Sequence, residues 1–280
     1  MRSLAARIRT AAWLGWQIES NWADPFLFGV YTVARPVATA MILAGMYWAV
    51  SGQATHGALF ATFYVANSFH NYVTTVLIGM GWVVVEERED YETLKYVYTS
   101  PIGMFTYLGG RGLVKLVLGT VSLVITLLVG WFLVGVRWEW TAVAWLPLGL
   151  TLVLGLASCL WLGFLVAGIG LLLPRAAITL NEGIAVALYL LCGVIFPVDF
   201  LPRVLREIAL AIPFTSWYEC LRRFLLGRGS SETLGGWSDA SLLGLLIAST
   251  AAFAVVSHFG YLALERRARR LGRLDQTTMF

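Results

Sequence analysis

Long apolar stretches constrain this chain more than any other feature. Several runs of about 18 or more residues carry almost no charge, which is the length that an α-helix needs to cross about 30 Å of hydrocarbon. Of the 280 residues, 59% are apolar and 13% are charged, a balance far from that of soluble domains. The runs are continuously apolar rather than alternating, so they predict helices and not barrel strands. We therefore expect an all-α membrane protein.

The sequence predicts a single transmembrane domain over residues 1–280. We predict six transmembrane helices, at residues 31–51, 59–84, 104–136, 142–172, 176–197 and 238–263. Lys and Arg near the span ends are more numerous on the side that holds the N-terminus. Because positively charged loops stay in the cytoplasm, both termini are expected there, and residues 264–280 form a cytoplasmic tail. The expected location is the inner or plasma membrane of the cell.

The first 24 residues predict an amphipathic helix that lies in the headgroup layer. One helical face carries Leu4, Ile8, Ala11, Gly15, Ile18 and Trp22, and Arg2, Arg7 and Arg9 lie off it. A signal peptide fits less well, because the apolar stretch is short and Glu19 and Asp24 follow closely. The alternative is a frayed, solvated terminus.

Residues 197–236, between the fifth and sixth spans, are too charged to cross a membrane and too apolar for a free loop. Pro197, Pro202 and Pro213 stand where helices could start, and apolar residues follow at helical spacing. We predict two short amphipathic external helices joined at Pro213. They dip into the outer leaflet or pack on the spans, because backbone at membrane depth needs internal hydrogen bonds.

Two sets of polar residues interrupt the apolar spans. One face of the second span carries Asn67, His70, Asn71 and Thr74. This face predicts a substrate path or a subunit seam, since polar groups at that depth need partners or water. The alternative is interhelical hydrogen bonding, worth about 0.6 kcal/mol a pair. Near the start of the fifth span, Asn181 and Glu182 are further candidates for the substrate path or the subunit seam. Glu182 could bind a cationic group or gate an entrance, and the alternative is an acid that simply reaches water at the interface.

Small residues recur at or near every fourth position in two spans. The positions are Gly155, Cys159, Gly163 and Ala167 in one span, and Gly119, Ser122, Thr126 and Gly130 in the other. Such spacing lets helices approach closely, so we predict tight helix packing at these faces.

No catalytic, nucleotide-binding or metal-binding motif stands out. The patterns G-x-x-x-x-G-K-[ST], G-x-S-x-G and H-E-x-x-H do not occur. The three cysteines and three histidines are scattered without metal-ligand spacing. The net charge of +4 reflects basic residues at the span ends, so nothing points to nucleic acid. We expect no enzyme activity and no cofactor on this chain itself.

Residues 86–101, between the second and third spans, begin with the charged sequence "EEREDYETLK". They predict a short amphipathic helix over 86–99, with Arg88 paired with Glu92 one turn on. The apolar stripe of this helix comprises Tyr91, Leu94 and Tyr98. Ser-Pro at 100–101 ends the helix. An aromatic stripe suggests a docking surface for another protein, and the alternative is a charged connector that lies on the headgroups.

The sequence "ETLKYVYTSPIG" after this acidic run resembles the E-R-E-x-G-T-L-E...S-P-I signature of ABC type-2 exporter permeases. The later "GVIFPVDFLPRVLREIALAIPFTSWYECLRRFLLG" is similar to the second signature of that family, a Gly-x-x-Phe-Pro run with further prolines before a basic helix. The matching positions are Glu87, Arg88, Glu89, Thr93, Leu94 and Pro101 in the first motif, and Gly193, Phe196, Pro197, Pro202 and Pro213 in the second. Glu92 stands at the position before Thr-Leu where the family usually has glycine. This departure leaves open which backbone geometry the position adopts and which ATPase subunit the chain accepts.

The resemblance implies a fold and a role. Permeases of this family pair as homodimers or heterodimers, each docked on a separate ATPase subunit that binds ATP and Mg²⁺. The cytoplasmic coupling helix between spans two and three fits a cleft of the ATPase, and short external helices between spans five and six lie over the exit. This chain is then expected to export a hydrophobic or amphiphilic compound such as a drug, a lipid or a lipid-linked glycan.

Two other classes of protein are alternatives to an export permease. One is a non-transporting assembly or anchor protein that recruits a soluble partner. The other is a secondary transporter, which would more often show paired buried charges near the midplane or inverted repeats.

Overall fold

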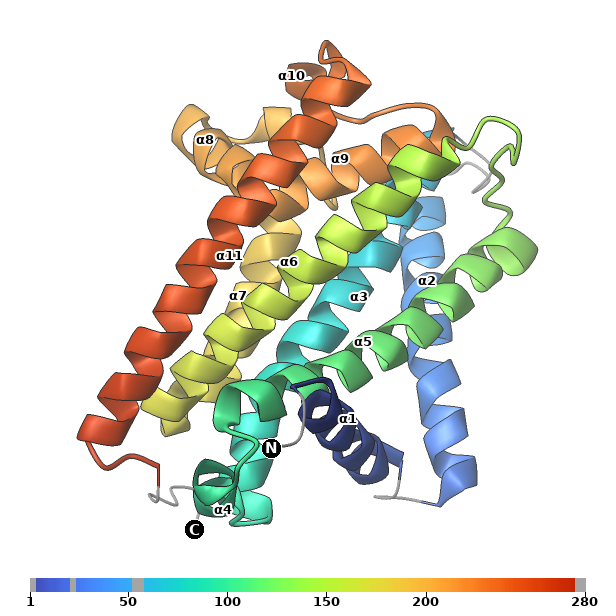
Figure 1. Ribbon diagram of the computed structural model, residues 1–280. Coiled ribbons are helices and arrows are strands. Elements are labelled where there is room, and N and C mark those ends of the chain that lie inside the picture. The colour runs from blue at the N-terminus through green and yellow to red at the C-terminus, as the bar shows by residue number, and fades with distance from the viewer. Residues whose placement is uncertain (1–3, 21–23, 52–57, 275–280) are drawn as a thin grey trace.

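The structure is a computed structural model that describes residues 4–20, 24–51 and 58–274 (Figure 1). These residues form helices and connecting turns without a β-strand, so the expected all-α chain is confirmed. The helices are α1 (Leu4–Ser20), α2 (Pro25–Ser51), α3 (Ala58–Val85), α4 (Leu94–Thr99), α5 (Met104–Val129), α6 (Trp145–Leu172), α7 (Ala177–Leu191), α8 (Arg203–Ala211), α9 (Pro213–Leu226), α10 (Glu232–Gly235) and α11 (Asp239–Arg270). The described chain also has π-helical turns at Glu86–Asp90 and Gly130–Val134 and 3₁₀ turns at Pro174–Ala176 and Val198–Phe200.

Five helical segments of the described chain are long and apolar enough to cross a membrane. They are Phe26–Ala49, Leu59–Asp90, Met104–Val134, Trp145–Leu172 and Asp239–Arg270. The remaining expected span, 176–197, corresponds to α7, whose 15 residues reach about 22 Å rather than about 30 Å. The expected length of this helix was wrong. α7 stops at Leu191 because Gly193, just beyond its end, takes a φ of 76° and turns the chain.

α3 lies at the centre of the bundle. It packs against α5, α6, α7 and α9. Of the residues in its most apolar stretch, 67% are buried inside the chain, against 12% for the corresponding stretch of α2. The expected close packing of small residues on α6 is confirmed. A Cβ at Gly163 would lie 2.1 Å from Met80 Sδ, and one at Gly155 would lie 1.9 Å from Cε2 of Trp217. α6 therefore approaches α3 and α9 more closely than a larger residue would allow.

Two helices extend beyond the predicted spans. α2 begins at Pro25 rather than at residue 31, and the Asp24 carboxylate accepts the backbone N–H of Phe26 at 2.8 Å, which caps its first turn. α11 continues to Arg270 rather than ending at residue 263, so the predicted tail 264–280 begins as helix. Residues 275–280 of that tail lie outside the described part of the chain.

α1 packs on α5 through the face that the sequence predicts as apolar. Ala11 and Gly15 on this face are buried, and a Cβ at Gly110 of α5 would lie 2.4 Å from Ala11 Cβ. Arg2 and Trp22 of the predicted helix lie outside the described residues. The small residues on both helices thus attach α1 directly to the bundle.

α8, α9 and α10 gather at the end of the molecule opposite to α1 and α4 (Figure 1). Pro202 precedes α8 and Pro213 is the first residue of α9, as expected from the positions of the prolines. Pro197 precedes the turn Val198–Phe200, and Phe196 is half-buried. α9 packs against α3, α6 and α11, so the expectation that this segment packs on the spans is confirmed for α9.

A buried ion pair connects α9 to α3 and to two neighbouring turns. The Glu219 and Arg222 side chains, each 2% exposed, lie 3.7 Å apart. Arg222 also donates to the carbonyls of Thr62 at 3.1 Å and Gly193 at 2.5 Å, and Glu219 accepts the backbone N–H of Ser230 at 2.9 Å. Both charges therefore have partners on several segments, which is what burial of an ion requires.

Glu219→Ala should lower the free energy of unfolding by about 3–5 kcal/mol, because it leaves the buried Arg222 charge without its carboxylate. Thermal unfolding in detergent micelles measures the change. The matched control is Glu207→Ala, since Glu207 pairs with Arg203 at 3.2 Å on the exposed side of α8 and such pairs contribute about 0–1 kcal/mol. Equal losses in the two variants would contradict a structural role for the buried pair.

Candidate functional site

The acidic stretch after α3 is not one helix. Glu86–Asp90 forms a π-helical turn, the helical conformation is interrupted at Glu92, and α4 covers only Leu94–Thr99. The predicted continuous helix over 86–99 is therefore wrong. Glu92 has a φ of 51° and is the only non-glycine residue with a positive φ in the described part of the chain. It stands where the first signature has glycine, which adopts this conformation without a steric cost.

Contacts of Glu87 hold the chain in its turn at Glu92. Its carboxylate accepts hydrogen bonds from the hydroxyls of Thr93 and Tyr107, and Arg111 Nη1 lies 3.4 Å from it. Its backbone carbonyl accepts the N–H of Thr93 at 2.8 Å. A carboxylate that is 2% exposed needs such donors. Because Thr93 is held against Glu87 through both side chain and backbone, the chain turns at Glu92 instead of continuing as a helix.

Arg88 and Glu89 are also buried, with exposed fractions of 3% and 8%. Arg88 donates to the carbonyls of Gly170 and Leu171, each at 3.1 Å. These carbonyls lie at the C-terminal end of α6, where backbone oxygens lack helical partners and carry the negative end of the helix dipole. The predicted pair between Arg88 and Glu92 is therefore wrong.

α5 supplies basic partners for the acidic side chains. Arg111 Nη2 lies 2.7 Å from Glu86 and 3.5 Å from Glu19 of α1, and Lys115 Nζ forms an ion pair with Glu19. Lys115 fits along α3 because Gly79 leaves room, since a Cβ there would lie 2.7 Å from Lys115 Cδ. α1, α3 and α5 are thus joined by charges as well as by apolar packing.

Six side chains make up what we call the charged cluster. They are Glu19, Glu86, Glu87, Arg88, Arg111 and Lys115. Their contacts connect α1, the turn after α3, α5 and α6, and Arg88 contributes through its hydrogen bonds to α6 carbonyls rather than through an ion pair with these carboxylates. Within residues 4–20, 24–51 and 58–274, no group of three or more His, Cys, Asp or Glu side chains could hold a metal ion. The cluster is therefore an arrangement of ion pairs and hydrogen bonds.

Part of the charged cluster is missing from the sequence-based expectation. Glu19 and Glu86 are not among the predicted site residues, nor is Tyr107, which donates to Glu87 beside the cluster, and Arg111 and Lys115 count there only toward membrane orientation. The spacing of four residues between Arg111 and Lys115, inside an otherwise apolar run, was a signal of buried acidic partners. Nothing in the sequence pointed to Gly170, because a backbone carbonyl has no residue signature.

The predicted contact stripe is only partly accessible. Leu94 is 2% exposed and belongs to the hydrophobic core. Tyr98 is partly buried against that core, and the Arg269 guanidinium lies 4.6 Å from the centre of its ring. Tyr91 and Tyr96 are 47% and 63% exposed. The exposed side of this segment therefore differs from the stripe that helical periodicity predicts.

The accessible side of α4 and the preceding turn carries aromatic groups and charges of both signs, because Asp90 and Glu92 are exposed there as well as Lys95. We call Tyr91, Lys95 and Tyr96 the outward face. Partial burial, and then the Glu86 carboxylate, raise the pKa of Tyr91. The exposed Pro101 follows α4, and its carbonyl accepts a hydrogen bond from Arg7 of α1 at 3.3 Å. The segment that carries the outward face is therefore bonded to Glu87 of the charged cluster at Thr93 and to Arg7 of α1 at Pro101.

The polar face of α3 lies against α7 and α9. Asn67 Oδ1 accepts a hydrogen bond from the Tyr189 hydroxyl of α7 at 2.9 Å. His70 Nδ1 lies 3.0 Å from the Tyr218 hydroxyl of α9. Both contacts are interhelical hydrogen bonds at membrane depth, so these two side chains already have partners within the chain.

The other polar residues of the spans differ in their surroundings. Thr74 donates to a backbone carbonyl of its own helix at 3.0 Å, and Asn71 Nδ2 is buried with no hydrogen-bond partner among the described residues. Asn181 is 2% exposed, and a Cβ at Gly81 would lie 1.8 Å from its Nδ2. Glu182 is exposed. The structure thus places Asn181 and Glu182 on different faces of α7.

Glu92→Gly should raise the free energy of unfolding by about 1 kcal/mol, because glycine adopts a left-handed φ without the steric cost that Glu92 bears. The matched control is Glu92→Ala, which removes the same carboxylate but keeps the Cβ, and it should not stabilise the protein. Thermal unfolding in detergent micelles compares the two. If alanine stabilised as much as glycine, the charge rather than the backbone would be responsible.

The chain matches a family model described as ABC-2 type transporter over residues 8–226. The match runs from α1 to the last residue of α9, so it includes the charged cluster and the outward face. A search of curated proteins finds no match. Members of the matched family are membrane permease components that pair with an ATP-binding subunit. Since the match covers well over half of its length, this chain belongs to the ABC-2 type transporter family.

Proposed function

We propose that this chain is the permease subunit of an ATP-driven exporter. It moves a hydrophobic or amphiphilic compound, such as a drug, a lipid or a lipid-linked glycan, outward across the inner or plasma membrane. ATP and Mg²⁺ bind to a separate ATPase subunit, in line with the lack of a phosphate-binding loop in this sequence. A second permease, identical or different, completes the transporter. The family match supports the permease role.

The observation that carries the proposal is that residues 86–101 are exposed on one side and bonded to the transmembrane helices on the other. One side presents the outward face to solvent, and the other side is bonded through the charged cluster to α1, α3, α5 and α6. A protein docked on the outward face would therefore act on a segment that is attached to four helices. Rigid-body movement of packed helices is an established way to convert such a local displacement into a change of access.

We propose a six-span topology with α7 as the fifth crossing. α1, α4 and the last turns of α11 lie at one end of the molecule, and α8, α9 and α10 lie at the other (Figure 1). With six crossings both termini lie on the side of α4, which is the cytoplasmic side in this proposal and carries more basic residues. The turn Pro174–Ala176 and the chain after Leu191 would complete the short crossing of α7.

The polar residues of the spans are proposed to line the substrate path or the seam with the second permease. Asn71 supports this reading best, because its buried amide nitrogen has no partner among the described residues, whereas Asn67 and His70 do. Asn181 and Glu182 lie near the cytoplasmic start of α7 in this topology. α8 and α9 would cover the exit.

Tyr96→Asp should abolish co-purification of the ATPase with this chain. The substitution places a carboxylate on the outward face, and loss of one anchoring tyrosine typically costs about 2 kcal/mol, or roughly thirtyfold in affinity. Because Tyr96 is 63% exposed, the fold should tolerate the change. Affinity capture of the tagged permease, with the amount of bound ATPase quantified, measures the effect.

The matched control is Phe200→Asp, since Phe200 is an aromatic residue that is 79% exposed at the opposite end of the molecule. This variant should retain the ATPase. Full ATPase retention by Tyr96→Asp would refute docking on the outward face. Substrate movement by a proton gradient without any ATPase would favour a secondary transporter, and a bound ATPase without substrate-stimulated hydrolysis would favour an anchor protein.

A further inference from the structure

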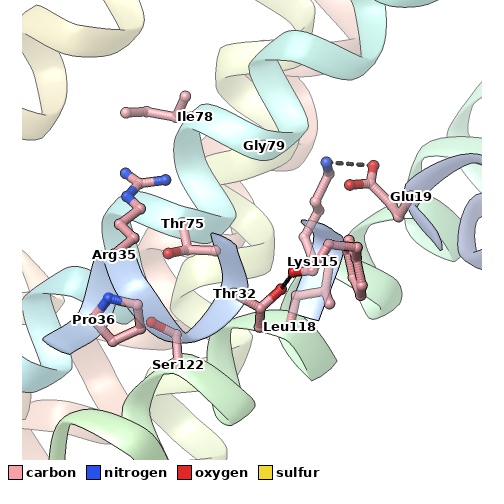
Figure 2. Close-up of a pocket in the computed structure, with 11 residues that line it drawn as sticks. Glu19, Thr32, Arg35, Pro36, Thr75, Ile78, Gly79, Lys115, Leu118 and Ser122 are labelled. Atoms are coloured by element: carbon pink, nitrogen blue, oxygen red, sulfur yellow. Dashed lines mark hydrogen bonds and ion pairs between the residues drawn. The ribbon is translucent and has the colours of Figure 1, made fainter. Parts of the chain in front are cut away.

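A cavity of about 200 Å³ lies between α1, α2, α3 and α5 (Figure 2). Its polar lining residues are Glu19, Thr32, Arg35, Thr75, Lys115 and Ser122. Figure 2 draws Arg35 on one side of the cavity and the ion pair between Glu19 and Lys115 on the other. The lining thus combines apolar side chains with hydroxyl groups, one carboxylate and two basic groups, the composition of sites that bind small polar or amphiphilic ligands.

Arg35 lines this cavity, and its side chain is exposed. It is the only charged residue in the 27 residues of α2 and stands about 15 Å along the helix from Pro25. No Asp or Glu of the described residues forms an ion pair with it, whereas Lys115 across the cavity is neutralised by Glu19. An ionised side chain within a membrane helix calls for an anion or water as its partner. The cavity therefore carries one positive charge in excess at Arg35.

The hydroxyl groups of the cavity are not equivalent. Thr32 and Thr75 donate their hydroxyl hydrogens to backbone carbonyls of their own helices, at 2.7 and 2.9 Å, so their oxygens face the cavity as acceptors. Pro36 has no N–H, so it cannot donate to the Thr32 carbonyl, which is a further acceptor in this turn. Arg35 supplies donors. A matching ligand combines an anionic group with hydroxyl groups.

The size of the cavity indicates how much of a ligand it encloses. Pockets that enclose a drug-sized molecule measure about 300–1,000 Å³, so about 200 Å³ holds a headgroup and not a complete amphiphile. α2, which forms one wall, has only 12% of its apolar window buried inside the chain. Acyl chains that extend from the cavity would therefore find apolar helix surface and lipid beside it.

We propose that this cavity binds the phosphodiester headgroup of an anionic, hydroxyl-bearing phospholipid such as phosphatidylglycerol. Arg35 binds the phosphate, for which a guanidinium has matching geometry. Thr32 and Thr75 accept hydrogen bonds from the hydroxyls of the headgroup. The site lies within this chain alone, so it is independent of the ATPase and of the docking proposed for the outward face.

The test is native mass spectrometry of the purified permease, without ATPase, titrated with dioctanoyl phosphatidylglycerol. Arg35→Gln should weaken binding about tenfold, while Arg35→Lys should recover part of the loss because it restores the charge without the planar fork. The matched control is Arg175→Gln, since Arg175 is an exposed arginine in the turn Pro174–Ala176 and does not line the cavity. This control should bind as the unchanged protein does. Thermal unfolding confirms that each variant is folded.

Three outcomes would overturn the proposal. Equal losses in Arg35→Gln and Arg175→Gln would mean that the lipid responds to surface charge and not to this cavity. Equal affinity for dioctanoyl phosphatidylcholine would remove the requirement for an anionic headgroup. Binding of inorganic phosphate as tight as that of the lipid, and equally dependent on Arg35, would identify a free anion rather than a phospholipid as the ligand.

Discussion

A carboxylate sealed inside a membrane protein has to be met by donors, and the arrangement of helices around Glu87 follows from that requirement. Thr93, Tyr107 and Arg111 supply these donors, and Arg111 in turn contacts Glu86 and Glu19. Removing two charges from water is costly, so ion pairs of this kind add little net stability, but they leave few alternative arrangements. The charged cluster thus determines where α1, α5 and the start of α4 lie relative to α3.

The two ends of the molecule follow the same physical pattern. At the end with α9, Glu219 and Arg222 are buried and bonded to several segments, as the charged cluster is at the end with α4. α11 reaches both ends. Asp239 in its first turn pairs with Arg223 of α9, and Arg269 in its last turn lies over the Tyr98 ring. The apolar middle of the bundle is therefore bounded by polar contacts that orient the helices, which apolar packing alone does only weakly.

Much of the architecture was accessible from the sequence, because its causes are local. Apolar length predicts the five long spans but not the short α7, proline positions predict the starts of α8 and α9, and the spacing of Gly155 and Gly163 predicts close packing of α6. The candidate site was less predictable because its causes are long-range. Helical periodicity places Leu94 and Tyr98 on an outer stripe, yet Leu94 is in the core, and the partners of Arg88 are backbone carbonyls 82 and 83 residues away. Exposure could be assigned only once the tertiary contacts were known.

Because α2 is buried only slightly against the other helices, its position depends on what occupies the cavity beside it. α2 contributes one wall of the cavity, while α1, α3 and α5 contribute the others. Only 12% of the most apolar stretch of α2 is buried, so few internal contacts hold this helix. A displacement of α2 therefore changes the cavity at a small cost in free energy to the rest of the bundle. By thermodynamic reciprocity, a ligand that fits one position of α2 better than another favours that position, and any partner that moves α2 changes the affinity for the ligand by the same factor. If the cavity binds the phospholipid headgroup that we propose, the composition of the surrounding bilayer becomes a variable in the conformational equilibrium of this permease.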